Sequence, residues 1–186
     1  MKTRQFQVVC TSFLVMVLAV AITALPRPLA AQAPLSGTIR PLLNGGECMQ
    51  PVNGSTVAGA AIVLGPCSGH NEPAQQWTIV PFKGIYVHYV NQLSGMCLDA
   101  RGGAKNHTPV QQWPCNSISN EYWVYSPVNA DPAATSSSPV FIYSGVAGSY
   151  GQSGGNFCLD VPGGHATSGA ALQIYKCNFT ASQEWF

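Results

Sequence analysis

The 186-residue chain carries eight basic and seven acidic residues, so its formal net charge is +1 and only 8% of its residues are charged. This balance leaves no basic surface of the kind that binds nucleic acid or an anionic membrane, and we expect no nucleic-acid partner. The length is sufficient for one domain with its own hydrophobic core.

The N-terminal residues predict a secretory signal peptide. Two basic residues precede an apolar run over residues 8–25, and a segment rich in proline and small residues follows. This order is typical of an exported chain, so we predict a signal peptide over 1–31, cleaved after Ala31 or Ala33. The alternative is an uncleaved anchor, because the run almost reaches the roughly 20 residues that span a bilayer.

Cleavage would change both the charge and the cysteine content. The mature chain would keep five basic and seven acidic residues and would lose Cys10, which leaves six cysteines. We expect this mature protein to be secreted, either to the extracellular space or to the periplasm, with no membrane insertion after cleavage.

One pattern occurs three times in the rest of the chain, at about 39–80, 84–126 and 140–186. In each copy a second cysteine follows the first by 18 or 19 residues. Regularly spaced cysteines in an exported chain indicate disulfides, and the repeat selects one bond within each copy. The predicted pairs are Cys48–Cys67, Cys97–Cys115 and Cys158–Cys177. Each closes a loop of about 20 residues, which stabilises the fold by roughly 3 kcal/mol.

Each copy ends with a tryptophan eight or ten residues after its second cysteine, and these are Trp77, Trp123 and Trp185. We predict that all three are core residues, with the indole N–H hydrogen-bonded inside. Trp113 also follows a Gln-x pair, but it lies two residues before a cysteine, as Tyr175 does. Trp113 is therefore expected outside the core.

Short apolar segments between turn residues predict strands at 78–82, 85–90 and 140–144. No stretch after the N-terminal run has a clear helical period. The chain is therefore predicted to be all-β. Because one repeat alone cannot bury its apolar face, we expect three equivalent units around a pseudo-threefold axis.

Two of the copies begin with Cys-Leu-Asp, have an aromatic residue two positions before the second cysteine and end with a Gln-x-Trp or Glu-x-Trp triplet. Together with the looser first copy, this pattern resembles the ricin B-chain type of lectin domain, also called the R-type lectin or β-trefoil carbohydrate-binding module. The resemblance implies a twelve-stranded β-trefoil over about residues 38–186, with up to three sugar sites. It also implies galactose-type or related sugars as ligands.

The chemistry of a sugar site requires an aromatic ring for the apolar face of a pyranose and fixed polar groups for its hydroxyls. A carboxylate accepts charge-assisted hydrogen bonds, and an amide both donates and accepts. The second repeat supplies Asp99, Gln111, Trp113, Asn120 and Glu121. Glu121 departs from the family pattern, because it replaces the glutamine of Gln-x-Trp.

The third repeat supplies Asp160, Gln173, Tyr175 and Gln183, but Ser182 stands where the family usually has asparagine. The alternative for both repeats is structural, since an aspartate before a Gly-containing loop commonly caps a turn. Trp113 and Tyr175 would then be peripheral core aromatics.

The first repeat lacks both central groups. Gln50 stands at the aspartate position and Gly65 at the aromatic position. We therefore expect this repeat to be structural only.

No motif points to an enzyme, a metal site or a cofactor. The repeats scatter the acidic residues, whereas glycoside hydrolysis needs two carboxyls within about 5 to 10 Å. The histidines, expected on turns, show no ligand spacing.

The sequence therefore predicts a non-catalytic secreted lectin whose partners are glycans or polysaccharide. A targeting subunit with a partner catalytic chain, in a toxin or glycosidase assembly, is the first alternative. The second is a β-trefoil protease inhibitor that acts through an exposed loop at 127–139.

Overall fold

The fold is described from a computed structural model, which describes residues 35–127, 138–146 and 156–186. All of them belong to one compact unit, Ala33–Phe186. The predicted signal peptide and most of the 127–139 loop lie outside the described residues. Within the described part, no helix is both long and apolar enough to span a membrane.

The described residues form twelve β-strands and only 3₁₀ helices of three residues each. The strands are β1 Leu35–Gly37, β2 Glu47–Pro51, β3 Ile62–Pro66, β4 Trp77–Pro81, β5 Val87–Asn91, β6 Cys97–Ala100, β7 Thr108–Trp113, β8 Trp123–Pro127, β9 Val140–Ser144, β10 Phe157–Asp160, β11 Gln173–Lys176 and β12 Glu184–Trp185. The 3₁₀ helices are η1 Val52–Gly54, η2 Gly69–Asn71, η3 Pro73–Gln75, η4 Ser119–Glu121, η6 Pro162–Gly164 and η7 Ala181–Gln183.

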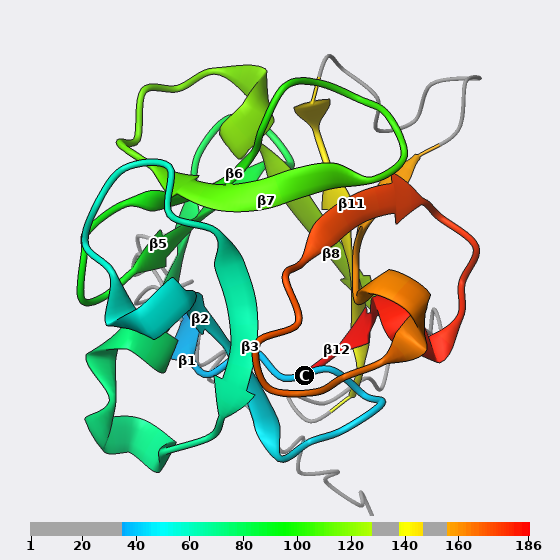
Figure 1. Cartoon of the computed structure of the whole chain (residues 1–186). Coiled ribbons are helices and arrows are strands. Elements are labelled where there is room, and N and C mark those ends of the chain that lie inside the picture. The colour runs from blue at the N-terminus through cyan, green and yellow to red at the C-terminus, as the bar shows by residue number, and fades with distance from the viewer. Residues whose placement is uncertain (1–34, 128–137, 147–155) are drawn as a thin grey trace, which may run out of the picture. The chain divides into compact units, whose positions relative to one another are not determined.

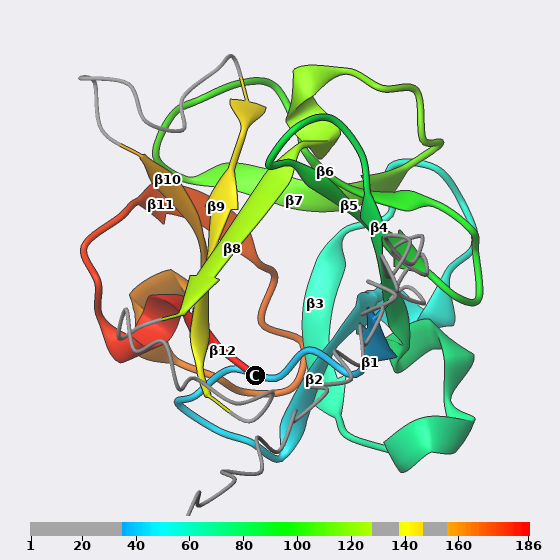
Figure 2. The same ribbon diagram turned by 180° about the vertical axis from the view of Figure 1, so that it is seen from behind.

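The first and last strands of the three repeats form a closed barrel. Around it, β1 pairs with β4, β4 with β5, β5 with β8, β8 with β9 and β9 with β12, all antiparallel. The ring closes between Arg40 and Phe186, whose backbones exchange hydrogen bonds of 2.9 and 2.8 Å. Figure 2 shows this barrel from behind, with β8 and β9 in front.

The middle strands of each repeat form a hairpin, and the three hairpins cover one end of the barrel. Figure 1 looks onto this end, where β3, β7 and β11 surround the centre. Equivalent positions pair in a cycle from one repeat to the next. The cyclic contacts are Ala61–Gln111, Pro109–Gln173 and Ala171–Val63. This cycle gives the unit its pseudo-threefold symmetry. The predicted all-β class is confirmed by the twelve strands.

The core lies where the three repeats meet, and the three tryptophans at the repeat ends are at most 1% exposed. Each indole Nε1 donates to a backbone carbonyl of its own repeat. These bonds run from Trp77 to Met49 at 2.9 Å, from Trp123 to Leu98 at 2.9 Å and from Trp185 to Leu159 at 3.1 Å. The polar end of each ring is thus satisfied inside an apolar core.

All three disulfides are formed within their repeats, as predicted. Each joins the first strand of a hairpin to a cysteine that lies one or two residues after the end of the second strand. The predicted strand at 140–144 matches β9, and those at 78–82 and 85–90 overlap β4 and β5 with bounds shifted by one or two residues. The expectation of turns was wrong for His88, which lies inside β5 and is buried beneath the ring of Phe82, with ring centroids 4.3 Å apart.

Candidate functional site

The second repeat places its polar and aromatic candidates on one face of a hairpin. Asp99 on β6 is opposite Gln111 on β7, and Cys97 is opposite Trp113. Because side chains alternate along a strand, Asp99, Gln111 and Trp113 point the same way. Gln111 Nε2 donates to Asp99 Oδ1 at 2.8 Å. The amide therefore holds the carboxyl beside the aromatic ring.

Exposure differs sharply within this group. Asp99 is 2% exposed, whereas Trp113 is 39% exposed. Burial raises the pKa of the Asp99 carboxyl, and the hydrogen bond from Gln111 partly opposes this rise. A ring open to solvent beside a recessed carboxyl provides both surfaces that a sugar requires.

Glu121 lies at the end of η4 and is fully buried. Its Oε2 accepts from the backbone N–H groups of Asn116 at 2.9 Å and Ser117 at 3.1 Å. Burial raises the pKa of the Glu121 carboxyl, these hydrogen bonds lower it, and the nearby Asp99 raises it again. Glu121 therefore supports the loop from inside and presents no group to solvent. The neighbouring Asn120 is half-buried.

The third repeat repeats this geometry. Asp160 on β10 is opposite Gln173 on β11, and Cys158 is opposite Tyr175. Gln173 Nε2 donates to Asp160 Oδ2 at 2.7 Å, and Gln183 Nε2 donates to Oδ1 at 3.2 Å. Burial raises the pKa of Asp160, while these hydrogen bonds and the charge of His107 lower it. Both oxygens of this carboxyl thus have a donor.

Gln183 supports the loop after β11, as Glu121 supports the loop after β7. Its Oε1 accepts from the backbone N–H groups of Asn178 at 2.9 Å and Phe179 at 3.2 Å. Gln183 is fully buried. Like Glu121, it lies on the buried side of the aspartate carboxyl of its repeat. The sequence pattern predicted that both residues bind sugar.

In the first repeat, Gln50 occupies the space of the missing aromatic ring. A Cβ atom at Gly65 would lie 2.6 Å from Gln50 Nε2, so a larger residue here would require the Gln50 side chain to move. Gln75 Nε2 donates to Gln50 Oε1 at 2.7 Å. A polar hollow of about 380 Å³ remains here, and its lining includes Glu72, which the sequence pattern did not single out.

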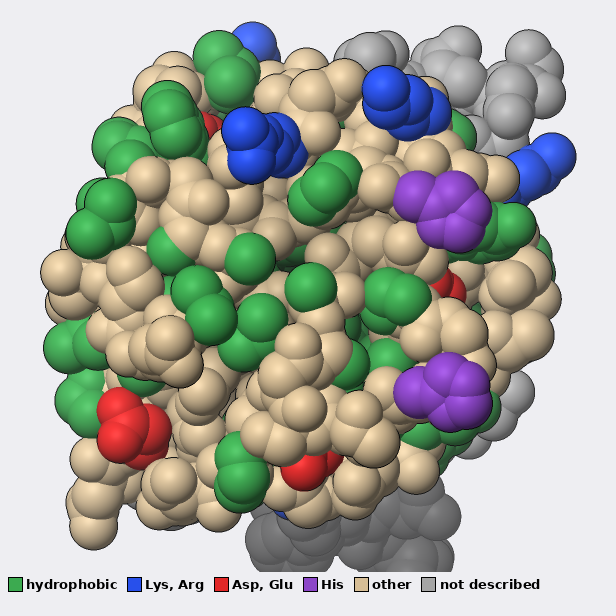
Figure 3. All heavy atoms as spheres, viewed as in Figure 1, with side chains coloured by type: hydrophobic (Ala, Val, Ile, Leu, Met, Phe, Trp, Pro, Cys, Tyr) green, Lys and Arg blue, Asp and Glu red, His purple; other side chains and the backbone are tan. Residues whose placement is uncertain are grey.

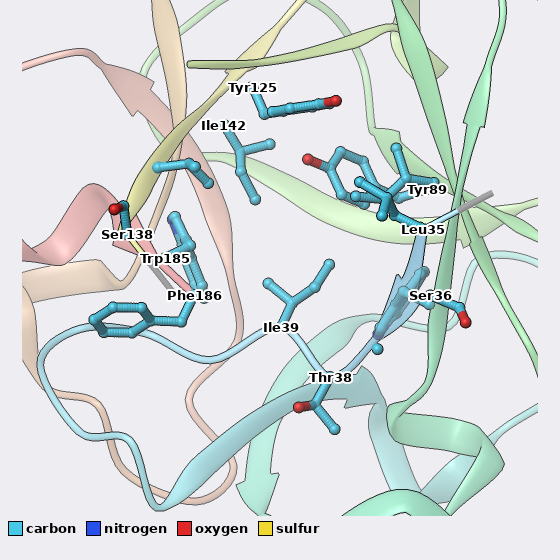
Figure 4. Close-up of a pocket in the computed structure, with 14 residues that line it drawn as sticks. Leu35, Ser36, Thr38, Ile39, Tyr89, Tyr125, Ser138, Ile142, Trp185 and Phe186 are labelled. Atoms are coloured by element: carbon cyan, nitrogen blue, oxygen red, sulfur yellow. The ribbon is translucent and has the colours of Figure 1, made fainter. Parts of the chain in front are cut away.

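A cavity of about 520 Å³ lies away from these hairpins (Figure 4). Tyr89, Tyr125, Ile142 and Trp185 line it together with residues of β1 and Phe186. No carboxylate or amide side chain is among the described residues that line it. The cavity therefore lacks the carboxylate and amide pair that the second and third repeats present, and its polar side chains are hydroxyls.

One cluster of potential metal ligands occurs within the described residues, formed by His88, Cys97 and Glu121, with ligand atoms within 4.8 Å of one another. The sulfur of Cys97 is bonded to Cys115. Two ligands remain, fewer than a zinc site uses.

Comparison with known proteins identifies the fold family. Residues 35–138, more than half of the chain, match the family described as the ricin-type beta-trefoil lectin domain. The chain belongs to this family. No curated protein sequence matches it significantly.

Three solved structures illustrate how this ricin-type β-trefoil chain compares with others. The designed threefold-symmetric protein ThreeFoil is 20% identical, with a TM-score of 0.67 over 81% of this chain and 95% of that one. The Macrolepiota procera ricin B-like lectin in complex with lactose is 19% identical, with a TM-score of 0.59 over 84% and 96%. The Haemophilus ducreyi cytolethal distending toxin is 19% identical, with a TM-score of 0.57 over 81% of each chain.

At these identities the similarity establishes the ricin-type β-trefoil fold, and the roles of individual residues rest on their geometry. The family match ends at residue 138, before β9. The third repeat nevertheless has the same hairpin, disulfide and buried tryptophan as the other two.

Proposed function

We propose that this protein is a secreted, non-catalytic lectin that binds galactose-type sugars through its second and third repeats. One observation carries the proposal. Asp99 and Asp160 are each hydrogen-bonded to a glutamine on the facing strand, with an aromatic side chain two residues farther along it. The first repeat has neither the carboxylate nor the ring.

The chemistry of each group supports this proposal. A carboxylate accepts charge-assisted hydrogen bonds from two adjacent hydroxyls. The apolar face of the sugar packs on Trp113 or Tyr175. The lectin solved with lactose has the same fold, and lactose, which contains galactose, is therefore the first ligand to test.

Two sites on one rigid body would bind a multivalent glycan more tightly than either site alone, because the second contact forms within the complex. Secretion is supported by the predicted signal peptide and by three disulfides, which persist in oxidising compartments.

A second candidate is a sugar-binding targeting subunit of a toxin or glycosidase assembly. The similarity to a cytolethal distending toxin favours it. The protease-inhibitor alternative depends on the 127–139 loop, most of which lies outside the described residues.

A glycan array tests the main proposal. The mature, oxidised protein should bind galactose-terminated glycans, and the Asp99→Asn/Asp160→Asn variant should lose this signal while its tryptophan fluorescence stays native. Glu72→Gln is a matched control, because it removes a carboxylate at the first repeat only. Equal binding by the double variant would refute the proposal, and release of sugar from the bound glycans would contradict its non-catalytic part.

A further inference from the structure

The tip of the second repeat's hairpin lies against the site of the third repeat. Asn106 Oδ1 accepts from the backbone N–H of Lys176 at 2.8 Å. His107 Nδ1 is 3.0 Å from Gln173 Oε1. The imidazole also meets the ring of Tyr175 edge-on, with centroids 5.1 Å apart. A side chain of one repeat thus contacts two candidate sugar ligands of the next.

The backbone at His107 favours glycine, because its φ is +63°. The equivalent positions of the other repeats are Gly59 and Gly169, both with φ of +85°. In each repeat the following residue makes the cyclic backbone contact to the next hairpin. Left-handed conformations disfavour residues with a Cβ atom, so His107 is held there against its backbone preference. Such residues concentrate at functional sites.

The hydrogen bonds around Gln173 place a ring proton on Nδ1 of this imidazole. Gln173 Nε2 donates to Asp160, so its Oε1 faces His107 and must accept from Nδ1–H. In the neutral form of the imidazole this is the single ring N–H, so Nε2 is then a hydrogen-bond acceptor. His107 is exposed, and within the described residues Nε2 has no donor. Figure 3 views the molecule from the same direction as Figure 1 and shows two histidine side chains on the side where β11 lies.

We propose that His107 belongs to the third-repeat sugar site, where it orients the Gln173 amide and offers Nε2 to a sugar hydroxyl beside Tyr175. This inference rests on the proposed lectin function. At the second site the equivalent residue is Gly59, where an added Cβ would lie 3.6 Å from Trp113 Cζ3, and no imidazole is present. The two sites of one chain therefore differ in specificity, because only the third has this acceptor.

The test isolates each site and measures lactose binding by calorimetry. In an Asp99→Asn background only the third site remains, and adding His107→Gly should weaken lactose binding about five- to tenfold, the loss expected for one net hydrogen bond. The melting temperature should stay the same or rise, because glycine suits this backbone. In an Asp160→Asn background, His107→Gly should leave second-site affinity unchanged.

His107→Asn separates the two roles of the histidine. Asparagine tolerates a left-handed backbone, and its amide can replace Nδ1 at Gln173, but it has no counterpart of Nε2. We expect an affinity between those of His107 and His107→Gly. In NMR titrations the His107 Cε1–H resonance should shift with lactose, while that of the buried His88 should not.

Undiminished third-site binding in both His107 variants, or an unmoved His107 resonance at saturation, would overturn this inference and leave the lectin function intact. Absence of lactose binding in both single-site backgrounds would overturn the galactose-type proposal and this inference with it. If His107→Gly fails to fold, equal binding by His107→Asn would overturn the role of Nε2.

Discussion

Gln183 donates a hydrogen bond to the carboxyl of Asp160, with its Nε2 3.2 Å from Oδ1. Gln75 makes the equivalent bond to Gln50 in the first repeat, at 2.7 Å. In the second repeat this position is Glu121, which has no proton to donate when ionised. Asp99 therefore has a buried carboxyl as neighbour where the other repeats provide an amide.

Replacing Glu121 with glutamine should stabilise the protein. The amide would donate to Asp99, keep the acceptor for Asn116 and Ser117, and remove a buried charge. We expect the free energy of unfolding at neutral pH to rise by about 1 to 2 kcal/mol, measured by urea denaturation. Lactose affinity of the second site should rise as well. Gln183→Glu is the reciprocal control and should destabilise the third repeat, and a loss of stability in Glu121→Gln would contradict this account.

Stability and sugar binding should depend on pH in opposite directions. Burial raises the pKa values of Asp99, Glu121 and Asp160 above their ordinary 3.8, 4.5 and 3.8. The folded chain thus binds these protons more tightly than the unfolded chain. Their contribution favours folding at low pH and declines as pH rises through the raised values. Binding needs the carboxylates, so it weakens as pH falls through the same range.

Urea denaturation of the wild type and of the Asp99→Asn/Glu121→Gln variant, at about pH 4 and about pH 8, tests the direction in which stability changes with pH. The wild type should lose more stability between these pH values than the variant. Parallel curves would show that these carboxyls do not cause the dependence.

Two tryptophans of the same repeat should respond oppositely to truncation. Trp113 is 39% exposed, so Trp113→Ala should cost less than about 1 kcal/mol of stability but abolish second-site binding. Trp123 is fully buried, and Trp123→Ala should cost about 3 to 5 kcal/mol. Urea denaturation and calorimetry in an Asp160→Asn background measure both effects. Retained second-site binding in Trp113→Ala would show that the Trp113 ring is not part of the sugar site.

The first repeat can be rebuilt as a test of the site geometry. Gly65→Tyr alone should destabilise by about 1 to 3 kcal/mol, because its Cβ would meet Gln50 Nε2. Adding Gln50→Asp and Val63→Gln removes this side chain and copies the third repeat. The triple variant should recover part of the stability and show one more lactose site by calorimetry. Equal stability of the single and triple variants would show that Gln50 does not fill this space.

The sequence by itself determined the features that depend on local repetition. Cysteine spacing predicted which residues are bonded, and the distance of each tryptophan from its cysteine separated Trp123 from Trp113. Short apolar segments predicted β4, β5 and β9 because β-branched and aromatic residues between turn residues are a local signal of strands. Asp99 and Asp160 followed from the same alignment of repeats, since equivalent positions in a symmetric fold share their surroundings.

Only the tertiary structure decided which polar groups face solvent and which lie behind them. Glu121 and Gln183 turn inward because the backbone N–H groups of a loop need acceptors, and no local pattern reports that need. Gln50 fills the place of a ring because Gly65, opposite Cys48 on the facing strand, has no side chain to exclude it. His107 reaches the third repeat because the hairpins pair in a cycle. Contacts between repeats depend on how separate hairpins pack, and this information lies in no single stretch of the chain.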